Sequence, residues 1–171
     1  VCTETGDRAI VLGGAEHCTV EQCVCENGGS HRIWLLSGAV DVALLRNEIR
    51  DNRGQGIEVF KGCDACTVAY NRCSRNALGI HCHSVRRSLL LGNILEDNRS
   101  NGIDCNHCGE MRIVANHVER SGSPRSEENK VEGSGILLYR TRDTVVVGNV
   151  SINNDQGDTL RSGIQLMDNG E

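Results

Sequence analysis

One short phrase recurs along this chain: a brief apolar run, an Asn, a turn and then Gly-Ile or a related pair. The repeating isoleucines are separated by 23, 24, 23, 23, 33 and 28 residues. They are Ile10, Ile33, Ile57, Ile80, Ile103, Ile136 and Ile164. A fixed period in the range of roughly 20–50 residues is the signature of a stacked repeat architecture. The period therefore assigns each residue to a column of the stack.

The repeat unit is suited to short β-strands. Its apolar runs are brief and β-branched, as in TVVVGN and MRIVAN, and Gly, Asn, Asp and Ser interrupt them. Three short strands and three turns fit one period, and strands of successive coils would pair at about 4.8 Å. We predict an all-β fold: a parallel β-helix of about seven rungs, each of about 23 residues, in a single domain over residues 1–171.

A column of asparagines supports this fold. Each of these asparagines follows a repeating isoleucine by 13 or 14 residues. They are Asn47, Asn71, Asn93, Asn116 and Asn149, and Cys23 takes the same slot in the first rung. Stacked Asn side chains can hydrogen-bond along the solenoid axis. Asn149 and Asn98 also start glycosylation sequons; we expect Asn149 to be inaccessible and Asn98, in a turn, to be an acceptor only in a secreted eukaryotic protein.

The pattern resembles the right-handed parallel β-helix of the pectin-lyase-like superfamily over nearly the whole chain. Handedness follows from that resemblance and from the general right-handedness of parallel crossovers. Two rungs are longer than the others, which places loop insertions at about 121–134 and 153–162. Long solenoid loops gather on the binding face. Solenoid ends need caps, so three alternatives stay open: a fragment of a longer solenoid, caps made by loops, or oligomerisation through uncapped ends.

Composition excludes some partners. The net charge of −5 argues against nucleic-acid binding. No apolar run reaches 18 residues, so we expect no membrane span. We expect no cofactor, with Ca²⁺ as the one ion left open.

Ten cysteines suggest a disulfide scaffold or a metal site, and CDAC at 63–66 and CNHC at 105–108 look like zinc half-sites. Nine of the ten, however, fall in columns otherwise filled by small apolar residues, which predicts buried free thiols. The two CxxC pairs lie about two rungs, or roughly 10 Å, apart, too far for one tetrahedral zinc, and we expect no metal site. The neighbouring pairs Cys2/Cys25 and Cys82/Cys105 are the possible disulfides.

One outward strip differs from an ordinary solvated face. If the repeating isoleucines point inward, the residues one and three positions later point outward. These are Trp34 and Leu36, Glu58 and Phe60, His81 and His83, Asp104 and Asn106, Leu137 and Tyr139, and Gln165 and Met167. Three of the four aromatic residues lie here, framing titratable groups. That mixture suits a sugar chain, whose faces stack on rings while its hydroxyls take hydrogen bonds.

We therefore expect a sugar chain as partner, and the resemblance described next implies that it is an acidic polysaccharide. The predicted substrate-binding residues on and beside the strip are Trp34, Glu58, Phe60, Lys61, Arg86, Asn106, His107 and Arg140. We expect His81, between Glu58 and Asp104, to be held protonated by these carboxylates and to bind a substrate carboxylate.

GIHCHS at 79–84, GIDCNH one rung later and GILLYRTRDTVVVGN resemble the mannuronan C5-epimerases, which carry G-[FI]-D-P-H-D at such a position. Gly79, Ile80 and His83 match this motif. His81, Cys82 and Ser84 stand where the family has Asp, Pro and Asp.

The resemblance implies proton abstraction at C5 of a uronic acid in a polymer such as alginate, in an extracellular, cell-wall or periplasmic setting. His83 would be the base and Tyr139 the acid or a second base. Arg86 or Arg140 would neutralise the carboxylate, and Asp104 would replace a lost carboxylate. Epimerisation and β-elimination both stay open. Two other classes also remain: a non-catalytic carbohydrate-binding β-helix and a structural or protein-interaction solenoid.

Overall fold

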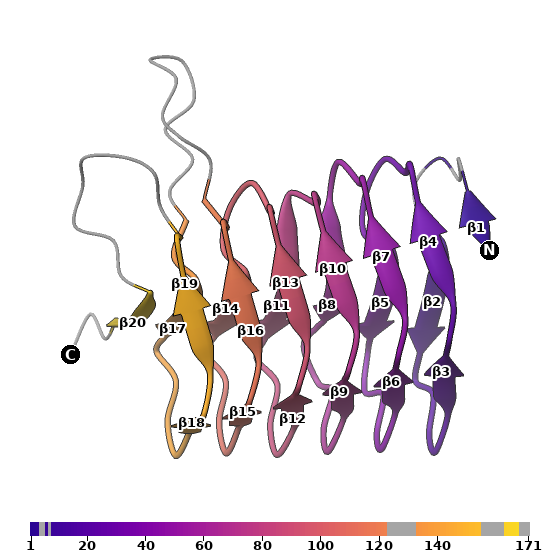
Figure 1. The fold of residues 1–171 in the computed structure, drawn as a ribbon. Coiled ribbons are helices and arrows are strands. Elements are labelled where there is room, and N and C mark those ends of the chain that lie inside the picture. Colours follow the sequence, from indigo (N-terminus) through magenta and orange to yellow (C-terminus); the bar gives the residue numbers. More distant parts are fainter. Residues whose placement is uncertain (4–5, 7, 123–132, 155–162, 168–171) are drawn as a thin grey trace.

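The computed structural model describes residues 1–3, 6, 8–122, 133–154 and 163–167. In these ranges the chain coils repeatedly, and each coil contributes one short strand to each of three parallel sheets (Figure 1). All the regular elements in the described ranges are strands. These ranges contain no helix that is long and apolar enough to cross a bilayer.

Sheet A and sheet B have seven strands each, and sheet C has six. Sheet A comprises β1 (Cys2–Thr3), β4 (Val24–Glu26), β7 (Glu48–Arg50), β10 (Arg72–Ser74), β13 (Ile94–Glu96), β16 (His117–Glu119) and β19 (Val150–Ile152). Sheet B comprises β2 (Ile10–Gly13), β5 (Ile33–Leu36), β8 (Gln55–Val59), β11 (Leu78–His83), β14 (Ile103–Asn106), β17 (Ile136–Tyr139) and β20 (Ile164–Met167). Sheet C comprises β3 (Thr19–Glu21), β6 (Ala43–Leu45), β9 (Thr67–Ala69), β12 (Leu89–Leu91), β15 (Arg112–Val114) and β18 (Val145–Val147).

The register of sheet B follows the isoleucine period. Each repeating isoleucine pairs with the next one along the chain, from Ile10 to Ile164. The five from Ile33 to Ile136 are fully buried. The predicted parallel β-solenoid of about seven rungs is therefore confirmed.

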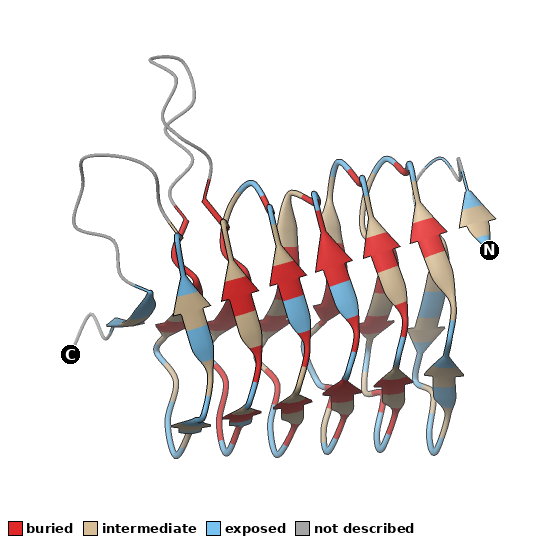
Figure 2. Cartoon of the chain, in the orientation of Figure 1, coloured by how far each residue is buried: buried red, intermediate tan, exposed pale blue. Residues whose placement is uncertain are grey.

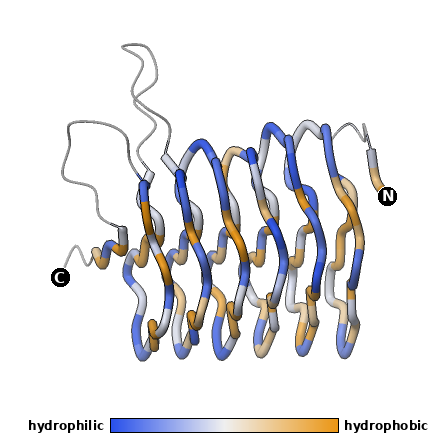
Figure 3. Tube along the Cα trace, viewed as in Figure 1, coloured by the Kyte–Doolittle hydropathy of each residue, from blue (hydrophilic) through white to orange (hydrophobic). Residues whose placement is uncertain are grey.

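The core is the bore of the solenoid. Figure 2 shows buried residues in the middle rungs and more exposed ones toward β18 and β19. Hydrophobic stretches recur at the same place in successive coils, separated by hydrophilic turns (Figure 3). Seven of the ten cysteines are buried in this bore, three are half-buried, and all ten are free. Burial raises the pKa of the Cys63 thiol to about 11, which makes it a poor nucleophile. No cluster of three or more metal-ligating side chains occurs in the described ranges.

The asparagine column forms a hydrogen-bonded ladder. The Oδ1 atom of Asn71 accepts from the backbone N–H of Asn47 at 2.9 Å, and its Nδ2 donates to the Leu44 carbonyl at 2.9 Å. The same pattern repeats at Asn93, Asn116 and Asn149. Backbone groups in the buried turns are satisfied this way without water.

A second ladder lies five residues after the first and was not predicted. It contains Asn52, Asn76 and Asn98, which are all buried. The Oδ1 atom of Asn98 accepts from the Asn76 backbone N–H at 3.1 Å, and its Nδ2 donates to the Cys73 carbonyl at 3.0 Å. The expectation that Asn98 offers an accessible glycosylation acceptor is therefore wrong.

Residues 123–132 and 155–162 make up most of the two predicted insertions, and they fall outside the described residues. The root of the first insertion is described. The backbone N–H of Ser134 donates to Asn101 Oδ1 at 2.6 Å, and the Ser134 hydroxyl lies 2.7 Å from Gln165 Oε1. This root therefore sits against the rungs of sheet B that contain β14 and β20.

Replacing Asn93 by Ala tests the first ladder. The change leaves the Asn71 backbone N–H and the Val68 carbonyl buried without a partner, so we expect the free energy of unfolding in urea to fall by about 2–4 kcal/mol. The control is Asn27→Gly, which removes an exposed amide at a φ of 54° where Gly costs little, and should change stability by less than about 1 kcal/mol. Equal losses in the two variants would contradict the ladder.

Thiol labelling tests the core assignment of the cysteines. We expect an aromatic disulfide reagent to label at most the three half-buried cysteines in the native protein, and all ten after unfolding in guanidinium. Fewer than ten reactive thiols after unfolding without reductant would reveal a disulfide and contradict the assignment.

Candidate functional site

The outer face of sheet B carries two neighbouring columns of side chains that run along the solenoid axis. The strand register places Glu58, His81 and Asp104 in one column and His83, Asn106 and Tyr139 in the other. The outward strip expected from the period is therefore assembled as one continuous surface. The rung spacing of about 4.8 Å brings residues on adjacent rungs into contact.

Six rings form a continuous ring row along this surface. The distances between successive ring centroids are 5.5, 6.4, 5.3, 5.7 and 5.6 Å. The row consists of His31, Trp34, Phe60, His83, His107 and Tyr139. Such separations are typical of interacting aromatic pairs. His31 was not predicted because it precedes its strand, where the alternation of strand residues does not apply.

Two guanidiniums lie against rings of the row, one on Trp34, the second ring, and one on Tyr139, the last. Arg8 lies over the Trp34 ring with its Cζ 4.2 Å from the centroid, and Arg140 lies 5.4 Å from the Tyr139 centroid. These are cation–π distances. The prediction of Trp34 as an exposed sugar platform therefore needs correction, because Arg8 covers a face of the ring. Phe60 and His83 are half-buried and stack with an interplanar angle of 20°.

A buried carboxylate supports the histidines from below. Glu58 is only 5% exposed, contrary to its expected role on an open surface. His81 Nδ1 donates to Glu58 Oε1 at 3.1 Å, and His31 Nδ1 lies 3.2 Å from Glu58 Oε2. Glu58 thus forms a hydrogen bond to His81 and lies close to His31, and little of its side chain is left open to solvent.

Asp104 is likewise enclosed, at 8% exposure. Its Oδ2 accepts from Asn101 Nδ2 at 2.8 Å and its Oδ1 from Asn106 Nδ2 at 2.6 Å. The same Asn106 nitrogen lies 3.4 Å from His81 Nε2. Side chains from neighbouring columns therefore cover both carboxylates of the strip, and the position of a residue along its strand did not predict this.

The environments of His81 and His83 shift their pKa values in opposite directions. Burial opposes a charge on His81, but the hydrogen bond to Glu58 and the charges of Asp104 and Glu58 outweigh it and raise the pKa of His81 above its ordinary value. Burial, followed by the charges of His81 and His107, lowers the pKa of His83. The two environments therefore favour the charged form at His81 and the neutral form at His83.

The cationic residues expected beside the strip take different positions. Lys61 and Arg140 are exposed, and Lys61 lies near enough to His83 to contribute to its lowered pKa. Arg86 is exposed on the turn after β11 and forms an ion pair with Glu110. Arg86 therefore lies beside the strip rather than on it, and its charge is partly neutralised.

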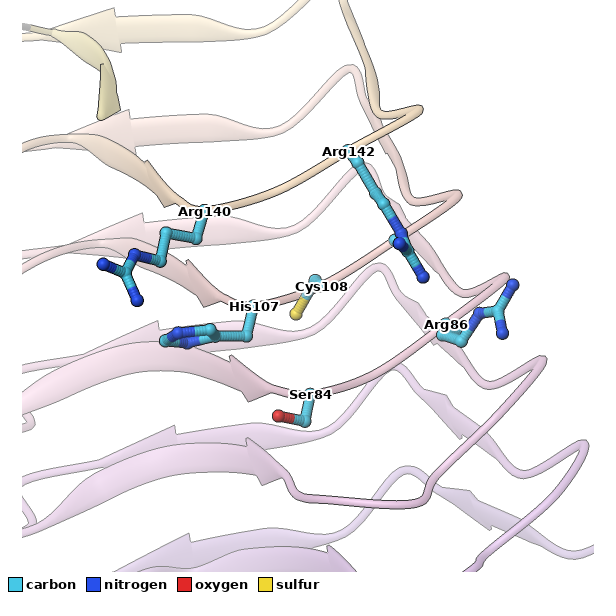
Figure 4. A pocket seen from close by; sticks show the side chains of 7 residues that line it. Ser84, Arg86, His107, Cys108, Arg140 and Arg142 are labelled. Atoms are coloured by element: carbon cyan, nitrogen blue, oxygen red, sulfur yellow. The ribbon is translucent and has the colours of Figure 1, made fainter. Parts of the chain in front are cut away.

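The turns that follow β11, β14 and β17 enclose a cationic hollow of about 340 Å³ (Figure 4). It is lined by Ser84, Arg86, His107, Cys108, Gly109, Arg140 and Arg142. Figure 4 shows His107 and Arg140 pointing to one side, while Arg142 extends toward Arg86. Ser84, Gly109 and Arg142 were not assigned to the site from the sequence, because the strand pattern says nothing about the turns.

Comparisons with known proteins identify the fold. A family model described as a right-handed β-helix region matches residues 3–124. Two solved structures, a single-substitution mutant and a double mutant of the periplasmic alginate epimerase AlgG, align over 97% of this chain at 16% and 18% identity, both with a TM-score of 0.54. The chain covers only 46% and 47% of those proteins. No curated protein matches the sequence. Identities this low show the fold alone.

Histidine titration by NMR tests the electrostatics of the site. We expect the pKa of His81 to lie above that of His83, and Glu58→Gln to lower the pKa of His81, because it removes the hydrogen bond to a carboxylate and its charge. Because folding raises the pKa of His81, the Glu58 pair stabilises the fold below the unfolded-state pKa. That stabilisation is lost as pH rises through the folded-state pKa.

The pH dependence of unfolding should therefore become flatter near neutrality in Glu58→Gln. The control is Asp41→Asn, which removes the partner of the exposed His17 and should leave the His81 titration unchanged. Identical titrations of His81 and His83 in the wild-type protein would contradict this electrostatic assignment.

Proposed function

The chain belongs to the right-handed β-helix family, and on that premise we propose that the ring row binds a polymer of uronic acids and that His83 abstracts the proton from C5 of one residue. The hydrogen at C5 is acidic because the adjacent carboxyl group can accept the electrons as an enolate. Return of a proton to the opposite face gives the epimer. Loss of the O4 substituent gives an unsaturated end, as in a lyase.

The observation that carries this proposal is the pair of imidazoles with opposed pKa shifts. The His81 and His83 rings lie 6.1 Å apart, with His83 in the middle of the ring row and His81 beside it. Two titratable groups driven apart in this way are characteristic of acid–base sites. A neutral His83 can accept a proton, and a charged His81 can stabilise the negative charge that develops on the substrate carboxylate.

The contacts of His83 suit a general base. Its ring stacks on Phe60 and touches His107, but within the described ranges its nitrogens make no hydrogen bond or ion pair. A substrate C–H can therefore approach them without displacing a protein partner. Tyr139, two rungs further along the same face, is the proposed proton donor, and Arg140 the proposed second cation for the carboxylate.

The ring row accounts for binding of the polymer. Sugar rings present apolar faces that stack on aromatic side chains, while the hydroxyls take hydrogen bonds. Successive rings of the row are separated by about one rung, so a chain lying along the solenoid axis would meet a new ring at each step. The structural neighbours are periplasmic alginate epimerases, which supports an acidic polysaccharide and a periplasmic or extracellular location as part of the proposal.

One observation favours a second candidate function, carbohydrate binding without turnover. Both oxygens of Asp104 accept from amides, and Glu58 is buried with a hydrogen bond to His81 and His31 close by. No carboxylate of the described strip is therefore free to act on substrate. Two of the motif positions that are acidic in the epimerases hold His81 and Ser84 here.

Incubation with polymannuronate and polygalacturonate in D₂O separates the two candidates. An epimerase exchanges the C5 hydrogen for deuterium and changes the anomeric NMR signals, whereas a lyase produces ultraviolet-absorbing unsaturated ends. We expect His83→Ala to reduce exchange by about 10²–10⁴-fold, because it removes the general base.

The control is His17→Ala, an exposed imidazole remote from the ring row, which should keep full activity. Measurable binding with no exchange and no unsaturated ends would reject the enzyme and leave the binding function. Retained exchange in a folded His83→Ala protein would reject His83 as the base.

A further inference from the structure

The cationic hollow is built from two columns of turn residues on three successive rungs. Arg86, Gly109 and Arg142 form one column through isolated parallel bridges. Ser84, His107 and Arg140 end the sheet B strands in the left-handed region, with φ values of 53°, 54° and 50°. This repeated bend places the second column between the hollow and the ring row.

Gly109 creates the space. In earlier rungs the same column carries the side chains of Glu16, Val40 and Asp64, and Gly109 then interrupts it between two arginines. The backbone of Gly109 does not require glycine, because its φ is not positive. A Cβ at this position would meet Arg142 at 3.5 Å, which is ordinary contact. Glycine is therefore not needed for folding here, and its effect is to leave the hollow open.

The charges around the hollow are unbalanced. Within the described ranges Arg140 and Arg142 form no ion pair. Arg86 pairs with Glu110, and the charge of Asp143 helps to raise the pKa of Arg86. Most other described arginines pair with carboxylates; these are Arg46, Arg50, Arg72, Arg75, Arg87 and Arg120. A local excess of positive charge in a chain of net charge −5 attracts an anion to this place rather than to the whole surface.

The arrangement fits a tetrahedral oxyanion better than a carboxylate. One planar guanidinium already satisfies a carboxylate through two parallel hydrogen bonds. Here a hollow of about 340 Å³ is lined by three guanidiniums, an imidazole and the Ser84 hydroxyl, with Ser84, His107 and Arg140 on one side and Arg86 and Arg142 on the other (Figure 4). A sulfate or phosphate ester has three terminal oxygens that point in different directions and can use such donors together.

We propose that the cationic hollow binds a sulfate or phosphate ester group carried by the polysaccharide that lies on the ring row. His107 belongs to both features, and Arg140 touches Tyr139 of the row while lining the hollow. An ester on a sugar stacked near His107 would therefore reach the hollow. The choice of polysaccharide rests on the proposed function, whereas binding of the oxyanion does not.

Calorimetric titration with three probes tests the inference: inorganic sulfate, a sulfated uronic-acid oligosaccharide and the unsulfated oligosaccharide of equal length. We expect the sulfated chain to bind about tenfold more tightly than the unsulfated chain. Gly109→Val, which fills the hollow, and Arg142→Ala should each remove that advantage and leave binding of the unsulfated chain within about twofold.

Two matched controls exclude general effects. Gly13→Val adds the same side chain to a sheet B glycine whose Cβ would also make only ordinary contacts. Arg112→Ala removes an exposed arginine on β15 that has no ion pair in the described ranges. Both should keep the preference for sulfate. Loss of the preference in the controls, or its persistence in Gly109→Val and Arg142→Ala, would overturn the inference.

The titrations distinguish a free oxyanion from one esterified to the polysaccharide. They also test the hollow independently of the proposed uronate function. Inorganic sulfate that binds the wild type as tightly as the sulfated chain, and loses binding in Gly109→Val, would support a hollow that serves a free ion. Sulfate binding without any binding of the unsulfated chain would reject the uronate function and keep the hollow. Binding of the unsulfated chain with no sulfate preference would reject the hollow and keep the function.

Discussion

The whole structure depends on each coil returning to the same place, one strand spacing further along the axis. Parallel pairing alone would tolerate slippage, but the asparagine ladders fix the turns as well as the strands. Each ladder side chain bonds backbone groups in preceding rungs, so a shifted coil would leave several buried groups unpaired at once. The ladders therefore convert a sequence period into a rigid register.

That register determines the geometry of the site. A ring at one position of a rung stands about one strand spacing from a ring at the same position of the next rung, which is close to the separation that aromatic pairs prefer. The stack of Phe60 on His83 is a direct consequence. His107 lies one residue beyond Asn106, the register partner of His83, and still contacts the His83 ring. The same spacing brings Glu58 and Asp104 to either side of His81 and explains why two adjacent imidazoles have opposed pKa shifts.

The sequence was sufficient for most features that lie along a column. The isoleucine pairing, the first ladder, the bore cysteines and the two outward columns of sheet B all follow from the period. Features that depend on contacts between columns did not follow from it. Asn101, outside the strand, closes over Asp104, and His31 reaches Glu58 from a turn. The second ladder lies five residues after the first and could have been found at that spacing. Gly28 and Ser121 interrupt its run of asparagines, which makes the column harder to recognise.

The site combines two kinds of polarity that a simple sugar-binding face would not need. Beneath the ring row, carboxylates and amides are fully engaged with one another and with His81, which fixes charge in place. Beside the row, Arg142 pairs through its backbone with Gly109 of the neighbouring rung, and Arg140 and Arg142 form no ion pair in the described ranges, which leaves charge unmatched. Buried, matched charge preorganises a reaction centre, whereas open, unmatched charge selects a ligand. The matched charges lie on the rungs of β8, β11 and β14, and the hollow lies on those of β11, β14 and β17. Because the two features overlap on β11 and β14, the proposed anionic polymer, once drawn to the hollow, would lie with a sugar ring over His83.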